Sequence, residues 1–229
     1  MKIVRAILLG AAISSPLLIP ACAKKDDVKE VINVKTKEAL DLERNALQKD
    51  EKKLAAQLFS WTSHLSDIGF DLSVIVPRKN REDDRQNAAY VDLTLRIQDF
   101  RNTSGTKFFY TKPENKAIDT YFNMIKAGES FAPYTKKYID MEDKDFTTFV
   151  EKTMKRIPDI AEDELEDWKR ISTERLKKYR EAISKVSETR AGFITKTEAF
   201  NKDAELSQQS IYEPTYGLTL ERLRLLKLK

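Results

Sequence analysis

The sequence predicts a helix-dominated α+β domain, and two observations support this fold class. Long stretches with apolar residues at helical spacing occupy about residues 28–68 and 159–200. Shorter stretches between and after them alternate apolar and polar residues, which is the period of a half-buried strand. Only 6 glycines and 7 prolines occur among the 229 residues, so few positions interrupt long helices. An all-α coiled coil or helical bundle is the alternative.

The first predicted helix, residues 28–68, contains a heptad repeat. The repeat consists of five apolar residues spaced by seven: Leu40, Leu47, Leu54, Trp61 and Ile68. This spacing keeps one stripe of the helix facing a partner helix. Arg44 and Glu51 take alternate positions of the stripe, which makes the N-terminal part a poorer coiled coil. Gly69 follows and is placed to end the helix as a left-handed cap.

A small antiparallel sheet is predicted from the strand-like stretches. These are residues 70–76, 90–100, 107–111 and, as a further candidate, 218–228. The first two alternate apolar and polar side chains, and the third follows a Ser-Gly turn. The last is rich in leucines that scatter around a helical wheel instead of forming one stripe.

Segment 90–100 also fits a helix, because Tyr90, Leu93, Ile97 and Phe100 would form a stripe. A helix would leave Val91 and Leu95 on the opposite, polar side. For that reason the strand is preferred.

The second long helix, residues 159–200, has its own buried stripe and an acidic start. The stripe comprises Leu165, Trp168, Ile171, Leu176, Tyr179, Ile183, Val186 and Phe193. Five acids occupy positions 162–167, where negative charge favours the helix dipole. We interpret them as a solvated helix start. A second acidic cluster, residues 140–145, lacks the central glycine and terminal glutamate of a calcium-binding EF-hand loop.

Residues 1–21 have the pattern of an export signal. Lys2 and Arg5 precede an uncharged apolar stretch that is too short to span a bilayer as an ordinary transmembrane helix. Ala21-Cys22-Ala23 fits the A-x-A pattern of soluble exported proteins. Cleavage after Ala23 would leave a mature protein without cysteine, and this possibility stays open beside the following one.

The residues Ile19-Pro20-Ala21-Cys22 resemble the lipobox of bacterial lipoproteins. The resemblance covers about the first tenth of the chain. It implies cleavage between Ala21 and Cys22 and a diacylglyceryl group on Cys22, the single cysteine. Two acyl chains anchor a protein stably to a membrane. Ala23 after the cysteine resembles the sorting pattern of lipoproteins sent to the outer membrane, so the expected location is that membrane, facing the periplasm.

The mature chain is expected to consist of a tether and one domain. Residues 22–27 are small or charged and hold the domain away from the bilayer. Residues 28–229 form a single helix-rich extracytoplasmic domain. Removal of residues 1–21 takes Lys2 and Arg5 from the 41 basic residues and leaves the 37 acidic ones, a mature charge near +2. Such a balance lacks the basic footprint of nucleic-acid binding, so no nucleic-acid partner is expected.

The sequence predicts neither a cofactor nor a catalytic site. His64 is the single histidine and lies between the seam residues Trp61 and Leu65, so a zinc site would lack a second imidazole. The chain has no nucleophile elbow, dinucleotide fingerprint or Walker pattern. We therefore expect a non-enzymatic structural or protein-interaction role in the cell envelope. The partner would be an envelope protein or a second copy of the chain.

The aromatic-rich segment 108–149 offers an alternative function, that of a periplasmic small-ligand-binding protein. Its candidate interface or pocket residues are Phe109, Tyr121, Phe122, Tyr134, Tyr138 and Phe149. A ligand-binding role predicts a cavity lined by some of these rings. An interaction role predicts an exposed apolar stripe along Leu40, Leu47 and Leu54. Aromatic side chains also form ordinary cores, so the three interpretations stay open.

Overall fold

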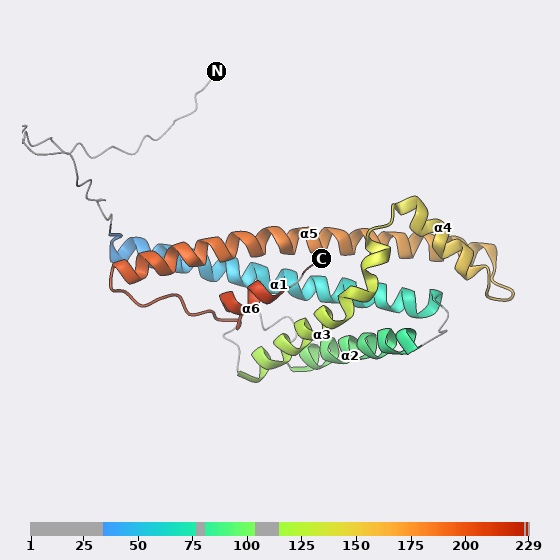
Figure 1. The fold of residues 1–229 in the computed structure, drawn as a ribbon, viewed down its shortest axis with the longest axis horizontal. Coiled ribbons are helices and arrows are strands. Elements are labelled where there is room, and N and C mark those ends of the chain that lie inside the picture. Colours follow the sequence, from blue (N-terminus) through green and yellow to red (C-terminus); the bar gives the residue numbers. More distant parts are fainter. Residues whose placement is uncertain (1–33, 77–80, 104–114, 227, 229) are drawn as a thin grey trace, which may run out of the picture. The chain divides into compact units, whose positions relative to one another are not determined.

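Six helices form the part of the chain that the computed structural model describes, residues 34–76, 81–103, 115–226 and 228 (Figure 1). They are α1 (Lys37–Ile75), α2 (Arg81–Thr103), α3 (Asn115–Ile139), α4 (Asp143–Met154), α5 (Glu162–Leu206) and α6 (Leu220–Leu225). These ranges contain no strand, so the predicted α+β class is wrong and the all-α alternative describes the fold. None of the helices in them is long and apolar enough to cross a membrane.

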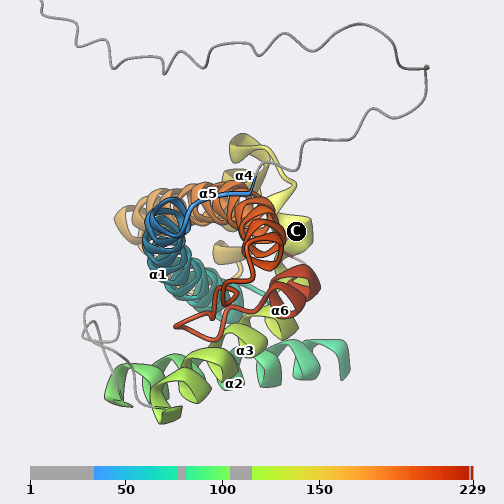
Figure 2. The ribbon, with the colours of Figure 1, turned by 90° about the vertical axis from the view of Figure 1, so that its left-hand side faces the viewer.

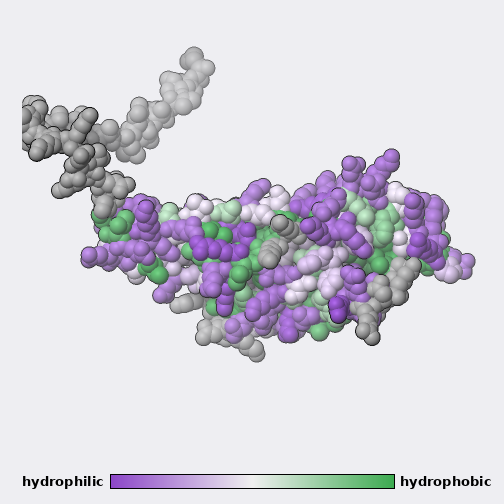
Figure 3. All heavy atoms as spheres, viewed as in Figure 1, coloured by the Kyte–Doolittle hydropathy of each residue, from purple (hydrophilic) through white to green (hydrophobic). Residues whose placement is uncertain are grey.

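The two long helices, α1 and α5, lie side by side along most of their lengths, and α2 and α3 form a second pair beside α1 (Figures 1 and 2). The heptad residues of α1 are buried as predicted, with exposed fractions of 3% or less. This burial contradicts the expected exposed stripe along Leu40, Leu47 and Leu54. Figure 3 likewise shows mainly hydrophilic side chains on the face that it draws, with apolar areas only in small groups.

Segment 70–76 is not a strand, because residues 70–75 belong to α1 and Val76 is the C-cap of that helix. The helix continues through Gly69 because Ile68, Leu72 and Ile75 extend its buried stripe at helical spacing. Phe70 and Val74, which suggested the strand alternation, lie on the exposed side of the same helix.

Segment 90–100 is part of α2, so the strand prediction there is also wrong. The helical stripe is the one that packs: Leu93, Ile97 and Phe100 are buried. Val91 and Leu95 lie on the solvent side of α2, where they are 45% and 53% exposed. Isolated exposed apolar residues are common on protein surfaces, and here they produced a false strand pattern.

The other strand predictions have different outcomes. Segment 107–111 lies outside the described residues. Segment 218–228 contains the short helix α6, whose N-cap Thr219 accepts the N–H of Arg222 through Oγ1 at 3.3 Å. Arg190 of α5 donates to the carbonyl oxygen of Leu223 at 2.8 Å. Leu223 of α6 is buried, and no strand occurs in the described part of this segment, so the strand prediction is wrong here as well.

The boundaries of the two long helices differ from the predictions. The described part of α1 begins at Lys37 after the N-cap Thr36, whose Oγ1 accepts the N–H of Ala39 at 3.3 Å. α5 begins at Glu162, three residues later than predicted, because Asp159 adopts a φ of 61° and cannot start the helix. At about 1.5 Å per residue, α1 is about 58 Å long and α5 about 68 Å.

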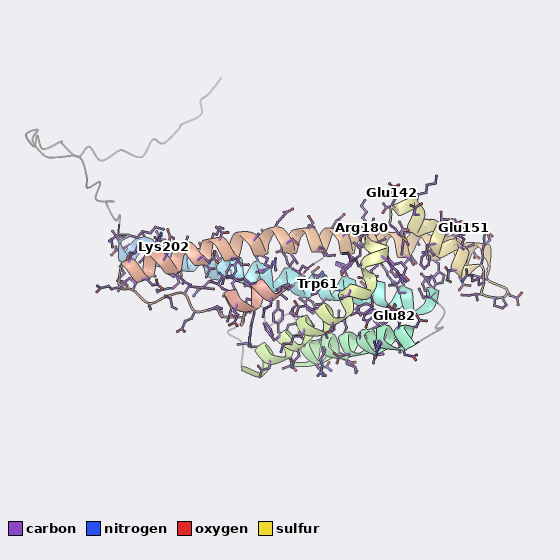
Figure 4. All side chains as sticks on the ribbon, in the orientation of Figure 1. Trp61, Glu82, Glu142, Glu151, Arg180 and Lys202 are labelled. Atoms are coloured by element: carbon purple, nitrogen blue, oxygen red, sulfur yellow. The ribbon has the colours of Figure 1, made fainter. Side chains whose placement is uncertain are left out.

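One arginine fixes the corner between α3 and α4 against α5 (Figure 4). Arg180 donates through Nε to the carbonyl oxygen of Ile139 at 2.9 Å and through Nη2 to that of Met141. Its Nη1 pairs with Asp143 in the first turn of α4. These contacts satisfy carbonyl groups that the end of α3 leaves without helical partners.

A C-terminal strap, residues 207–219, crosses from the end of α5 to α6 and is held by Glu51 of α1. Glu51 is fully buried, and its two carboxylate oxygens accept the N–H of Thr215 at 2.9 Å, the N–H of Tyr216 at 2.7 Å and the O–H of Tyr212. Arg44, one heptad earlier, donates to the carbonyl oxygen of Ser210 at 3.0 Å. The two polar positions of the heptad stripe therefore both bind the strap.

We expect Gly69→Ala to destabilise the protein, since Gly69 lets α2 approach α1. A Cβ atom at this position would lie 2.4 Å from Cδ2 of Tyr90 and 2.9 Å from Cε1 of Phe131, so rings in the core would have to move. Overpacking costs about 1–3 kcal/mol, whereas alanine gains at most about 1 kcal/mol over glycine in a helix. Urea denaturation should show a net loss. Gly192→Ala on α5 is the control and should gain stability, because no atom beyond the neighbouring residues and backbone of its own helix lies within 4 Å of the new Cβ.

Candidate functional site

The residues proposed from sequence as functional do not surround a single cavity in the described chain. Ala21, Cys22 and Phe109 lie outside the described residues. Tyr121 is fully buried and its O–H donates to the carbonyl oxygen of Ala55 at 2.8 Å, which joins α3 to α1. It is a core residue.

The other four aromatic candidates pack within or on the α3–α4 region. The rings of Tyr138 and Phe149 lie 5.2 Å apart, and Tyr134 packs against Phe131 at 6.3 Å. Phe122 is covered by the guanidinium of Arg222 at 4.1 Å from its ring centre. The contacts of Tyr138 and Phe122 join α3 to α4 and α6. Tyr134 also lines a mostly charged and polar surface hollow of about 550 Å³ between α2 and α3, which contains no other aromatic candidate.

A surface groove lies between the C-terminal half of α1 and the N-terminal half of α5. Its volume is about 370 Å³. It is lined by three apolar side chains, three acids and one arginine: Phe70, Trp168, Ile171, Asp163, Glu164, Asp167 and Arg175. We call it the α1–α5 groove. The volume is at the lower end of the range of small-molecule sites and would accept one long side chain or a molecule of that size.

Two aromatic rings form the floor of the α1–α5 groove. The rings of Phe70 and Trp168 are nearly parallel, with an angle of 17° and a distance of 6.4 Å between their centres. Phe70 is 46% exposed, although phenylalanine side chains are usually buried. The two rings therefore stack on each other and leave apolar area exposed to solvent.

The arginine of the groove is held by a buried carboxylate. Nη1 of Arg175 lies 2.5 Å from Oδ1 of Asp71, whose side chain has no exposed area. The guanidinium also lies 5.8 Å from the centre of the Phe70 ring. Burial raises the pKa of Asp71, and the charge and hydrogen bond of Arg175 oppose that rise. The pair leaves the positive charge of Arg175 largely balanced within the protein.

The three acids of the groove have few internal partners. Asp167 pairs with Arg170 at 2.9 Å, and both side chains are about two-thirds exposed, so the pair is weak. Among the described residues, no lysine or arginine forms an ion pair with Asp163 or Glu164. Negative charge therefore remains at the rim, where it also favours the start of α5.

Another groove, about 310 Å³ in volume, lies near the N-terminal end of α1, and it differs in its charges. There Lys196 pairs with Asp50 at 2.6 Å, and Lys35 pairs with Glu43 at 2.6 Å. The two lysines and two acids of this groove pair with one another, so their charges balance and do not favour a charged ligand. The α1–α5 groove therefore has the clearer chemical selectivity.

Sequence reasoning recognised the acids of the α1–α5 groove but missed the groove. The sequence places the acids at a helix start, Trp168 in a buried stripe and Phe70 in a strand. The missing signal was the continuation of α1 past Gly69, which places Phe70 on this helix next to Trp168 of α5. Only that continuation brings Phe70 beside α5.

No cluster of three metal-ligating side chains occurs among the residues described. His64 pairs loosely with Asp67, with 3.6 Å between Nδ1 and Oδ2, as expected for a residue at the edge of the seam. The site is thus defined by aromatic and charged side chains. Comparisons with protein-family models, with curated proteins and with solved structures find nothing that matches this chain.

Proposed function

We propose that this protein is a lipoprotein of the bacterial envelope. In this proposal a diacylglyceryl group on Cys22 anchors it to the outer membrane, facing the periplasm, and it acts by binding a protein partner, not by catalysis. The observation that carries the proposal is Ile19-Pro20-Ala21-Cys22 at the end of a short apolar stretch. The single cysteine of the chain stands where the lipid would be attached.

The α1–α5 groove supports a binding role for such a protein. It opens on the surface with a volume of about 370 Å³ and combines the partly exposed ring of Phe70 with the indole of Trp168 and three carboxylates. A concave site that combines apolar and charged side chains is suited to holding another molecule.

The anchor predicts a specific processing pattern. Mass spectrometry of the protein from the membrane fraction should find a mature chain that begins at a diacylated Cys22. An inhibitor of lipoprotein signal peptidase should make the unprocessed precursor accumulate. Cys22→Ser should move the protein from the membrane to the soluble fraction, because the thioether to the lipid cannot form.

Lys24→Ala is the control for the anchor, since it changes the same segment without removing the thiol and should leave the protein in the membrane fraction. A wild-type chain that starts at Lys24 and is soluble would contradict the anchor. Cleavage would then follow the A-x-A pattern.

A further inference from the structure

The α1–α5 groove combines two features that attract a positive charge. Aromatic ring faces carry negative electrostatic potential, and a cation above the face of a ring such as Trp168, which lines the groove, is stabilised. Glu164 lies four residues before Trp168 on α5 and therefore on the same side of the helix. A group that contacts the indole can thus also reach a carboxylate.

The charges around the two rings favour a cationic ligand over an anionic or a purely apolar one. Asp163 and Glu164 have no described cationic partner, and Asp167 has only the exposed Arg170. The one cation in the lining, Arg175, is paired with the buried Asp71. An anionic ligand would face uncompensated carboxylates, and a purely apolar ligand would leave them without any contribution to binding.

We propose that the α1–α5 groove binds a lysine or arginine side chain from an extended segment of a partner protein. This proposal deepens the proposed function and rests on it only in taking the occupant to be a protein. The methylene stem of such a side chain would cover the rings of Phe70 and Trp168, as long basic side chains commonly cover apolar surface. Its charged head would reach the carboxylates of Asp163 and Glu164.

Charge complementarity and size indicate which kind of side chain the groove would bind. A volume of about 370 Å³ accommodates a long side chain together with a short part of its backbone. Arg175 already lies 5.8 Å from the centre of the Phe70 ring, so a guanidinium beside this ring is compatible with the fold. A basic segment of a partner supplies the same chemistry from outside the chain.

The two tryptophans of the chain allow a direct test, because Trp61 is buried in the core and Trp168 lines the groove. The probe is tetralysine, added to the full-length protein while tryptophan emission is recorded. We expect a saturable change in emission that weakens as salt is added, whereas tetraglutamate and tetraglutamine cause none. The titration can be read in the anchored or the soluble form of the protein, so its result is separate from that of the anchor experiment.

Variants separate the groove from a general effect of charge. Asp163→Asn, Glu164→Gln and Asp167→Asn together should weaken tetralysine binding about tenfold, because three exposed carboxylates each contribute a modest attraction. Phe70→Leu keeps Trp168 as the reporter and should weaken binding about two- to fivefold through loss of the ring face. Circular dichroism of each variant checks that the helices are retained.

The control changes the same net charge at another acidic helix start. Asp140→Asn, Glu142→Gln and Asp145→Asn neutralise three exposed acids near the start of α4, and this variant should bind tetralysine within about twofold of the wild type. Equal weakening in the two triple variants would overturn the proposal, because binding would then follow overall charge. An unchanged affinity in Phe70→Leu, or no change in emission on addition of tetralysine, would overturn it as well.

Discussion

Replacing Glu51 by alanine is expected to release the C-terminal strap from α1 and to lower the free energy of unfolding by about 3 kcal/mol. The substitution removes the acceptor of three hydrogen bonds, from the N–H groups of Thr215 and Tyr216 and from the O–H of Tyr212. A buried donor without an acceptor costs about 1–3 kcal/mol, and the strap can limit the total loss by moving into water. Urea denaturation measures the loss, and hydrogen exchange of Thr215 and Tyr216 detects the release.

Two further variants serve as comparisons for Glu51→Ala. Glu38→Ala removes an exposed glutamate of the same helix and should cost less than about 1 kcal/mol. Glu51→Gln keeps the shape, but both carboxylate oxygens accept N–H groups, so the amide nitrogen would face a donor and an intermediate loss is expected. Unchanged exchange of Thr215 and Tyr216 in Glu51→Ala would show that the strap is held by other contacts.

The charge state of Glu51 reflects a balance between burial and hydrogen bonding. Burial raises the pKa of its carboxyl group, and the N–H groups of Thr215 and Tyr216 and the hydroxyl of Tyr212 oppose the rise. Burial and the neighbouring Glu51 raise the pKa of Tyr212 far above its usual value, so this hydroxyl stays protonated and can donate. The strap is therefore held by donors that do not titrate near neutral pH.

The role of Glu51 shows why part of the fold could not be predicted from the sequence. In the heptad pattern, Arg44 and Glu51 are departures from an apolar stripe and indicate weak helix pairing. Their partners, Ser210 and Tyr212 among them, lie more than 150 residues away in the chain. Helical periodicity describes only neighbours within a few turns, so it cannot reveal a strap that returns from the opposite end of the sequence.

The helices themselves were predictable where apolar periodicity agreed with packing. The stripe from Leu40 to Ile68 is buried as expected. The errors at 70–76 and 90–100 share one cause: exposed apolar residues such as Phe70 and Leu95 imitate strand alternation. Which of two competing apolar patterns is buried depends on neighbouring helices, and the local sequence does not contain that information.

Of the candidate site, only the cluster of acidic residues could be recognised from the sequence. The acids at positions 162–167 were visible in the sequence, but their pairing with an aromatic floor depends on α1 and α5 lying side by side. Phe70 and Trp168 are almost one hundred residues apart. The position of Cys22, in contrast, is a purely local signal, and a tertiary structure is not needed to recognise it.

Trp61→Ala is expected to lower the free energy of unfolding by about 3–5 kcal/mol, the usual cost of removing a large aromatic side chain from a core. Trp61 is 1% exposed and lies in the middle of α1 beside α3 (Figure 4). The approach is close: a Cβ atom at Gly128 of α3 would lie 3.0 Å from Cζ3 of Trp61. Because α1 packs on α5 as well as on α3, a movement of α1 into the cavity would disturb other contacts.

Trp168→Ala is the matched control, with the same change of residue on the other long helix. Trp168 is only partly buried, packs against the core and stacks on Phe70, so its removal should cost less than that of Trp61, about 2 kcal/mol from the aromatic pair and the apolar area that it covers. Urea denaturation followed by circular dichroism measures both variants without relying on tryptophan emission. Equal losses in the two variants would contradict this division, in which one tryptophan stabilises the core and the other is available for binding.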